Sequence, residues 1–216
     1  MGAVVDHLVV AAASLEEGVR WCEATLGVTP GPGGRHPLMG THNRLFAIGS
    51  EAFPQVFFEI MAIDPAAPAP GRARWFGLDT LDLAGGPRLL HVVARCNALA
   101  TLGAALRGAD QDVGPAIAAT RDTPQGRLEW HISVRADGRL LAGGAVPTLI
   151  DWGRTPHPTL SMAASGVALR QLALRGLAPA TQRALGLPGV ELPQDRGPAI
   201  LAILDTPRGR LTLSSI

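Results

Sequence analysis

A seven-residue segment occurs twice, almost unchanged, in this chain of 216 residues. Asp122-Thr-Pro-Gln-Gly-Arg-Leu128 returns as Asp205-Thr-Pro-Arg-Gly-Arg-Leu211. A near-identical heptapeptide indicates internal duplication, and its Pro and Gly residues favour a turn between two strands. We therefore expect a fold made of repeated units, each with a hairpin at this point.

The first repeated unit lies before the first heptapeptide. Its apolar runs alternate or recur with the periods typical of strands and helices. In the best strand, from Val56 to Ile63, every second residue, including Glu59, shares one face. The expected order is βαβββ, with strands at residues 4–12, 36–40, 43–49 and 56–63 and a helix that begins at the capping box Ser14-Leu15-Glu16-Glu17.

The same order then starts twice more. We expect a second βαβββ unit, followed by a third unit that stops one strand short. The predicted fold class is α+β, with tandem βαβββ modules that form a cupped mixed β-sheet and an incomplete third βαββ module. The expected division is a first module at 1–66, a linker at 67–86, a second module at 87–158 and a truncated third module at 159–216.

Composition excludes several kinds of chemistry. The chain has neither Lys nor Tyr, so Schiff-base catalysis, a phosphate-binding P-loop and a Tyr general acid are ruled out. The formal net charge is only +1, which gives no field for nucleic acid or an anionic membrane. We expect no partner of either kind.

Cys22 and Cys96 lie in apolar surroundings without CxxC spacing. Two free thiols in a reducing compartment are expected, rather than a disulfide or a nucleophile. No signal peptide and no bilayer-spanning apolar run is recognisable. These features predict a cytoplasmic protein.

The ordered motifs resemble a known superfamily. They are Asp6-His7-Leu8-Val9-Val10, Gly33-Gly34-Arg35-His36-Pro37, Gly40-Thr41-His42-Asn43, Phe58-Glu59-Ile60-Met61-Ala62 and Asp151-Trp152-Gly153. Together with the tandem modules they resemble the vicinal-oxygen-chelate superfamily, and most closely its glyoxalase-like domain proteins. The resemblance implies paired modules whose sheets form a cup around one small-molecule site.

By position, the resemblance carries over a metal-ligand set of His7, Glu59, His91 and Asp151. Two imidazoles and two carboxylates suit Zn, Mn, Fe, Co or Ni. Glu59 and Asp151 are the candidate catalytic residues, because a carboxylate that loosens from the metal can move a proton. A cup without metal is an equal alternative, in which these residues pair by hydrogen bonds. Asp151 also departs from the commoner Glu at the last strand.

Four further residues are candidates for ligand binding: His36 and His42 at the rim of the cup, His157 at the mouth of the pocket, and Asn43 through a contact with the substrate. Local structural roles are the alternative for each of them.

The leading hypothesis for function is a glyoxalase-like enzyme of lyase, isomerase or dioxygenase type that acts on a ligand with adjacent oxygens. A non-catalytic protein that binds or sequesters a small molecule is the second hypothesis, and an inert cup the third. A homodimer is also expected, since the strand edges of the third module need cover.

Overall fold

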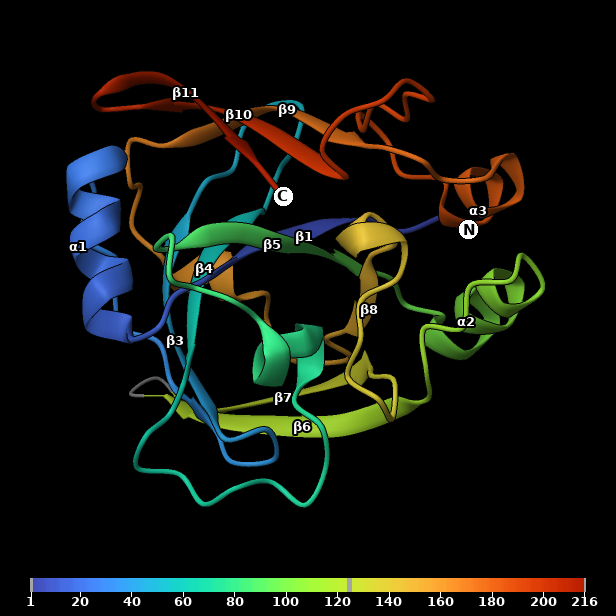
Figure 1. The fold of residues 1–216 in the computed structure, drawn as a ribbon, viewed down its shortest axis with the longest axis horizontal. Helices are drawn as coiled ribbons and strands as arrows, with labels where there is room; N and C mark the ends of the chain where they lie inside the picture. Colours follow the sequence, from blue (N-terminus) through green and yellow to red (C-terminus); the bar gives the residue numbers. More distant parts are fainter. Residues whose placement is uncertain (1, 124–125, 216) are drawn as a thin grey trace.

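The computed structural model describes residues 2–123 and 126–215. Its larger part is an eight-stranded mixed sheet curled into a cup, and its smaller part is a three-stranded sheet beside the cup (Figure 1). The elements of the first unit are β1 (Val4–Ala11), α1 (Leu15–Thr25), β2 (Arg35–His36), β3 (Thr41–Ala47) and β4 (Phe57–Ile63), followed by η1 (Trp75–Thr80). The second unit contains β5 (Arg88–Arg95), α2 (Leu99–Arg107), β6 (Ala116–Thr123), β7 (Gly126–Ser133), η2 (Ala142–Gly144) and β8 (Thr148–Asp151). After η3 (Pro158–Ser161) come β9 (Ala168–Leu174), α3 (Pro179–Leu185), β10 (Ile200–Thr206) and β11 (Gly209–Ser214).

The strand order β2-β3-β4-β1-β5-β8-β7-β6 shows two equivalent halves. Each half runs its first strand parallel to its last, as β1 beside β4 and β5 beside β8. The halves join through β1 and β5, which are antiparallel. The edge strands β2 and β6 come into contact, so the sheet is almost closed. The predicted α+β class, with tandem βαβββ modules and an incomplete third one, is confirmed. The four residue limits given to the modules and linker stay predictions.

The sheet has two differently covered faces. The convex face carries the larger apolar core, including Leu8, Phe58 and Ile60, and packs against α1, α2, α3 and the sheet of β9 to β11. The concave face carries a second core around Val9, Met61 and aromatic side chains. In Figure 1 the short η1 turn lies inside the cup, between β5 and the β6–β7 hairpin.

Trp75 and Phe76 begin η1 and belong to the concave core. Both are buried, and their rings stack at a centroid distance of 5.5 Å. The segment between the modules therefore fills part of the cup instead of lying loosely outside it.

Local sequence signals explain most element boundaries. Ser14 Oγ accepts from the Glu17 amide at 3.1 Å, so the predicted cap at Ser14 is confirmed. The Glu17 carboxylate reaches back as well, but it accepts from the amide of Ala13 instead of that of Ser14. The strand expected at 36–40 is wrong, because β2 ends at His36 and a turn follows. Pro37 has no amide hydrogen for a ladder, and Gly40 has a φ of +59°. Both residues favour the turn.

The duplicated heptapeptide forms equivalent hairpins. Thr123 pairs with Gly126 in the β6–β7 hairpin, and Thr206 pairs with Gly209 in the β10–β11 hairpin. The first hairpin's predicted turn residues Pro124 and Gln125 lie outside the described residues. Among the described residues, no helix has the length and apolar character needed to cross a bilayer.

Candidate functional site

A β-bulge near the start of β1 positions the first two polar residues of the site. The pairing of β1 with β5 slips by one residue between Val5 and His7, which leaves Asp6 as the extra residue. Neighbours in a regular strand point to opposite faces. The bulge relaxes this constraint, and Asp6 Oδ1 lies 2.6 Å from His7 Nδ1.

Asp6 is fully buried and accepts from two further side chains. Trp152 Nε1 donates to Asp6 Oδ2 at 2.9 Å, and His157 Nε2 lies 3.0 Å from the same oxygen. Burial alone would raise the pKa of Asp6, but the hydrogen bonds from His157 and His7 outweigh it and hold the pKa well below its usual range. Sequence reasoning did not select Asp6, although an Asp inside an apolar strand was the available signal.

His7 lies between two carboxylates. Its Nε2 is 3.4 Å from Glu59 Oε2, on the neighbouring strand β4, and its Nδ1 faces Asp6. Burial opposes the charged imidazole, but the hydrogen bonds to Asp6 and Glu59 raise the pKa of His7 to about 9. Burial would also raise the pKa of Glu59, and the same partner, His7, lowers it instead. At neutral pH the centre is therefore an imidazolium flanked by two carboxylates.

Asn43 connects Glu59 to the opposite wall of the cup. Its Nδ2 donates to Glu59 Oε1 at 2.5 Å and lies 3.4 Å from His36 Nε2. Its Oδ1 accepts from the Gly34 amide at 2.8 Å and from Arg121 Nη1 at 3.0 Å. These contacts use both donors and both acceptor positions of the amide and fix its orientation.

His36 is a neutral member of this group. Its Nδ1 lies 3.1 Å from Thr41 Oγ1, and the ring packs edge-on against Trp75 at a centroid distance of 5.1 Å. Burial lowers the pKa of His36 to about 4. The predicted ligand-binding residues His36 and Asn43 therefore lie deep in the cup, near Glu59, and His36 is not at the rim.

The other two predicted ligand-binding residues, His42 and His157, lie in different places. His42 follows the alternation of β3 to the opposite face from Asn43, where its Nδ1 is 3.9 Å from Asp64. His157 lies in the loop after β8 and reaches Asp6, so it does meet the cluster.

His91 occupies on β5 the place that His7 has on β1, but its surroundings differ. Its Nδ1 lies 3.0 Å from the carbonyl oxygen of Gly144, and its Nε2 accepts from the amide of Thr148 at 3.1 Å. Burial lowers the pKa of His91 to about 3, so the ring is neutral and donates from Nδ1. Both nitrogens are then occupied by the fold itself.

Asp151 lies at the end of β8, where its Oδ1 accepts from the Gly153 amide at 2.8 Å. Its neighbours Ile150 and Trp152 contribute to the concave core, so alternation places Asp151 on the other face. Its carboxylate therefore does not join Glu59.

The residues present do not fit the four-ligand metal site carried over from the resemblance. His7 and Glu59 approach each other, whereas His91 is satisfied by Gly144 and Thr148, and Asp151 is on the far face. Over residues 2–123 and 126–215, no three His, Cys, Asp or Glu side chains are arranged to hold a metal ion.

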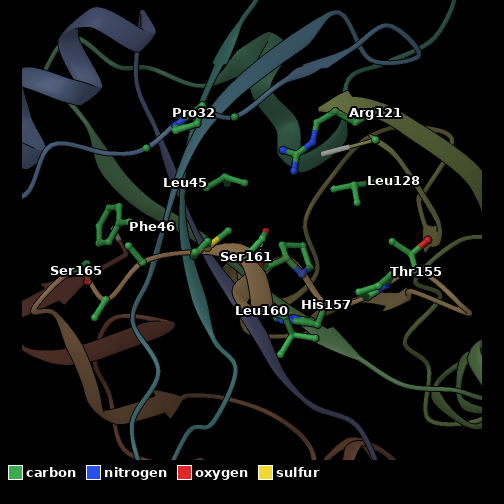
Figure 2. A pocket seen from close by; sticks show the side chains of 18 of the residues that line it. Pro32, Leu45, Phe46, Arg121, Leu128, Thr155, His157, Leu160, Ser161 and Ser165 are labelled. Atoms are coloured by element: carbon green, nitrogen blue, oxygen red, sulfur yellow. Dashed lines mark hydrogen bonds between the residues drawn. The ribbon is translucent and has the colours of Figure 1, made fainter. Parts of the chain in front are cut away.

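Two adjoining cavities give access to this cluster. An inner cavity of about 40 Å³ is lined by His7, Glu59, Asn43 and the indoles of the concave core. An outer cavity of about 1020 Å³ opens between β3, the β6–β7 hairpin and the segment 154–165. Leu45 and Arg121 line both cavities, and Figure 2 shows the Arg121 side chain directed into the space between Leu45 and Leu128. Arg121 was also not selected by sequence reasoning.

Comparisons with known proteins agree with this architecture. A family model described as "Glyoxalase-like domain" matches residues 5–186. The chain belongs to the glyoxalase-like domain family. This places it within the vicinal-oxygen-chelate superfamily, as the motifs predicted. The search of curated proteins found no match.

Several solved structures align with this glyoxalase-like protein. A hypothetical protein from Staphylococcus aureus aligns over 98% of this chain and 86% of its own, with a TM-score of 0.57 and 12% identity. A methylmalonyl-CoA epimerase from Mycobacterium tuberculosis aligns over 74% of this chain and 91% of its own, with a TM-score of 0.41 and 19% identity. Another methylmalonyl-CoA epimerase, in complex with methylmalonyl-CoA and NH4+, aligns over 73% of this chain and 100% of its own, at a TM-score of 0.46 and 13% identity. At 12% identity, the likeness to the Staphylococcus aureus protein shows a common fold and no more.

The glyoxalase-like cup thus holds a relay of paired polar side chains rather than a set of unpaired metal ligands. A continuous chain of contacts runs from the bulge in β1 to the junction of the two cavities, through Asp6, His7, Glu59, Asn43 and Arg121. Such a chain can place a carboxylate and an imidazolium beside one ligand and can hold a negative charge at Arg121.

Proposed function

We propose that this glyoxalase-like protein is a small-molecule enzyme that moves a proton on a ligand with adjacent oxygens. The observation that carries the proposal is the buried relay from Asp6 to Arg121 at the junction of the two cavities. Buried charges and perturbed pKa values that converge on a cavity are typical of catalytic sites.

Glu59 is the proposed base. Its carboxylate takes a proton from a carbon next to a carbonyl group, and the electrons of the broken C–H bond pass to the carbonyl oxygen as an enolate. The guanidinium of Arg121 stabilises the negative oxygen. The proton then returns to the same carbon. Where that carbon carries a hydroxyl group, the proton can instead return to the former carbonyl carbon while the hydroxyl proton moves to the enolate oxygen, so that a new carbonyl group forms. His7 keeps Glu59 ionised, since the imidazolium lowers the pKa of Glu59.

This chemistry is of the isomerase type among the reactions that the resemblance implied. It needs only positioned proton acceptors and donors, which the relay supplies. The proposal assigns no step to His91, whose nitrogens are held by Gly144 and Thr148, or to Asp151 on the opposite face.

A non-catalytic binding protein is the second candidate. It is favoured by the low exposure of the relay, since Glu59 is 4% and His7 5% exposed, and each already has a partner. In that case the relay is a fixed polar floor beneath the ligand.

Hydrogen exchange separates the two candidates even before the substrate is identified. A panel of 2-oxo acids, 2-hydroxy acids, 1,2-dicarbonyl compounds and acyl thioesters is incubated with the protein in D₂O, and loss of the α-proton signal is followed by NMR. At least one compound is expected to exchange, and Glu59→Gln is expected to slow that exchange about 100-fold or more.

His131→Gln is the control, because His131 is exposed on β7 and lies outside both cavities. Exchange that survives Glu59→Gln unchanged would remove Glu59 as the base. Panel compounds that quench tryptophan fluorescence but never exchange would favour the binding protein.

A further inference from the structure

The outer cavity contains a buried cation, Arg121, for which the described side chains supply no ion-pair partner within 4.0 Å. Arg121 is only 7% exposed, and its one hydrogen bond among the described residues is to the neutral Asn43. No carboxylate of the described residues lies within 4.0 Å of its guanidinium, and its Nε is buried without a partner. Burying an unpaired charge is costly, so such a group is normally completed by an anion.

The position of Arg121 is built into the fold. A Cβ atom at Gly34 would come within 2.3 Å of Arg121 Cδ, so the side chain lies directly over a glycine that leaves room for it. Asn43 then holds Nη1 from the other side. Arginine carries five N–H groups. Asn43 accepts from Nη1 and Nε is buried, so the donors of Nη2 remain for a ligand.

Charges around Arg121 limit the anion to a single negative charge. Glu59 lies behind Asn43 and already interacts electrostatically with Arg121. Glu129 lines the outer cavity, together with Arg127 and Arg154. Glu59 would repel a dianion at Arg121 more strongly than a carboxylate, and a carboxylate matches one guanidinium by two parallel hydrogen bonds.

The remainder of the outer cavity is mostly apolar. Its walls include Leu45, Phe46, Leu128 and Met162. Leu160 also lines it and is 67% exposed, although it is a large apolar residue. An apolar group in the cavity would cover this surface and be stabilised by its removal from water.

We propose that the outer cavity binds a predominantly apolar carboxylic acid, with its carboxylate on Arg121 and its apolar body against Leu45, Leu128 and Leu160. The inference rests on the proposed function for the role of this ligand as substrate. The binding itself depends only on Arg121 and the walls of the cavity.

Binding is measured by calorimetry and by quenching of tryptophan fluorescence, since Trp130 and Trp152 line the inner cavity. The probes are hexanoate, octanoate and decanoate below their micelle concentrations, with octanol, octylammonium and octyl phosphate as matched comparisons. Octanoate is expected to bind at least tenfold more tightly than each of the three comparisons. Affinity is expected to rise roughly three- to four-fold with each added methylene.

Two variants and one control locate the site. Arg121→Gln is expected to remove the preference for octanoate over octanol, and Leu160→Ser to reduce the gain from hexanoate to decanoate. Arg44→Gln removes an equal charge from an exposed position on β3. It is expected to leave unchanged both the preference for octanoate over octanol and the gain in affinity from hexanoate to decanoate. Equal binding of octanol and octanoate, tighter binding of octyl phosphate, or an Arg121→Gln protein that keeps the carboxylate preference would each overturn the proposal.

The same measurements distinguish this inference from the proposed function. Carboxylates that bind but never exchange an α-proton would leave the ligand class standing and refute the enzyme. Exchange on neutral carbonyl compounds, without carboxylate binding, would refute the ligand class alone.

Discussion

Asp6 Oδ1 and His7 Nδ1 are 2.6 Å apart, although the two residues are consecutive in β1. The contact exists because Asp6 is the extra residue of a bulge opposite β5. It converts the predicted metal-ligand position of His7 into one end of a buried ionic relay. The other end of that relay is Arg121.

Asp6→Asn should lower the pKa of His7 from about 9 towards the ordinary histidine value, because one of its two carboxylate partners is lost. An NMR titration of the His7 ring carbon and proton signals measures this change. Asp151→Asn is the matched control, since that carboxylate lies on the other face of the sheet. A His7 titration that is the same in wild type and Asp6→Asn would contradict the role given to the bulge.

Asp6→Asn should also destabilise the fold. The side chains of Trp152 and His157 would lose a charged acceptor in a fully buried place, at a cost of about 3 kcal/mol. Urea unfolding of both proteins at pH 7 gives the difference in free energy. A difference below about 1 kcal/mol would show that the loop after β8 does not depend on Asp6.

The protein should lose stability at alkaline pH through His7. The pKa of His7 is raised from 6.5 to about 9, so its contribution is complete below pH 6.5 and disappears as the pH passes 9. The loss should be about 2.5 kcal/mol between pH 7 and pH 10. Urea unfolding at both pH values tests it, and His7→Gln should flatten the difference. A wild-type protein equally stable at both values would contradict an imidazolium between the carboxylates.

The sequence predicts which side chains of β4 face into the cup, but it does not predict this for β1 or β8. Seven residues of β4 alternate without a bulge, so the position of Glu59 in the cup follows from period-two spacing. In β1 the bulge depends on pairing with β5, which is distant in the chain. β8 has only four residues, too few for alternation to show which of them face the cup. Trp152, which follows β8, faces the cup because its indole donates a hydrogen bond to Asp6.

The hydrogen-bond partners of a buried polar residue also cannot be predicted from the local sequence pattern. His7 and His91 occupy equivalent positions in the two halves of the sheet, yet Asp6 precedes one and Leu90 the other. The second imidazole is therefore satisfied by the backbone of Gly144 and Thr148 and becomes a structural group. Arg121 lies in the Ala-rich segment that forms β6. The sequence of this segment predicts a strand but gives no sign that the Arg121 side chain is buried.

At mildly acidic pH the protein should lose stability through His36 and His91. Burial lowers their pKa values to about 4 and about 3, so between pH 6.5 and pH 4 the unfolded chain binds two protons that the folded chain does not. Stability should therefore fall with acidification by up to about 2.7 kcal/mol per pH unit. Urea unfolding from pH 7 to pH 5 measures the slope. His91→Phe should lower stability at pH 7 but reduce the slope by one proton, and an unchanged slope would mean that His91 is charged in the fold.

Gly34→Ala should displace Arg121 without changing any charge. The new methyl group would meet Arg121 Cδ at 2.3 Å, and a flexible side chain moves away more readily than the backbone of β2 or β3. The carboxylate preference of the outer cavity should fall about tenfold, with a loss of stability near 1 kcal/mol. Gly71→Ala is the matched control, because a Cβ atom at Gly71 would have no neighbour within 4 Å among the described residues. If Gly34→Ala keeps full preference for octanoate over octanol in calorimetry, the anion does not depend on where Arg121 lies.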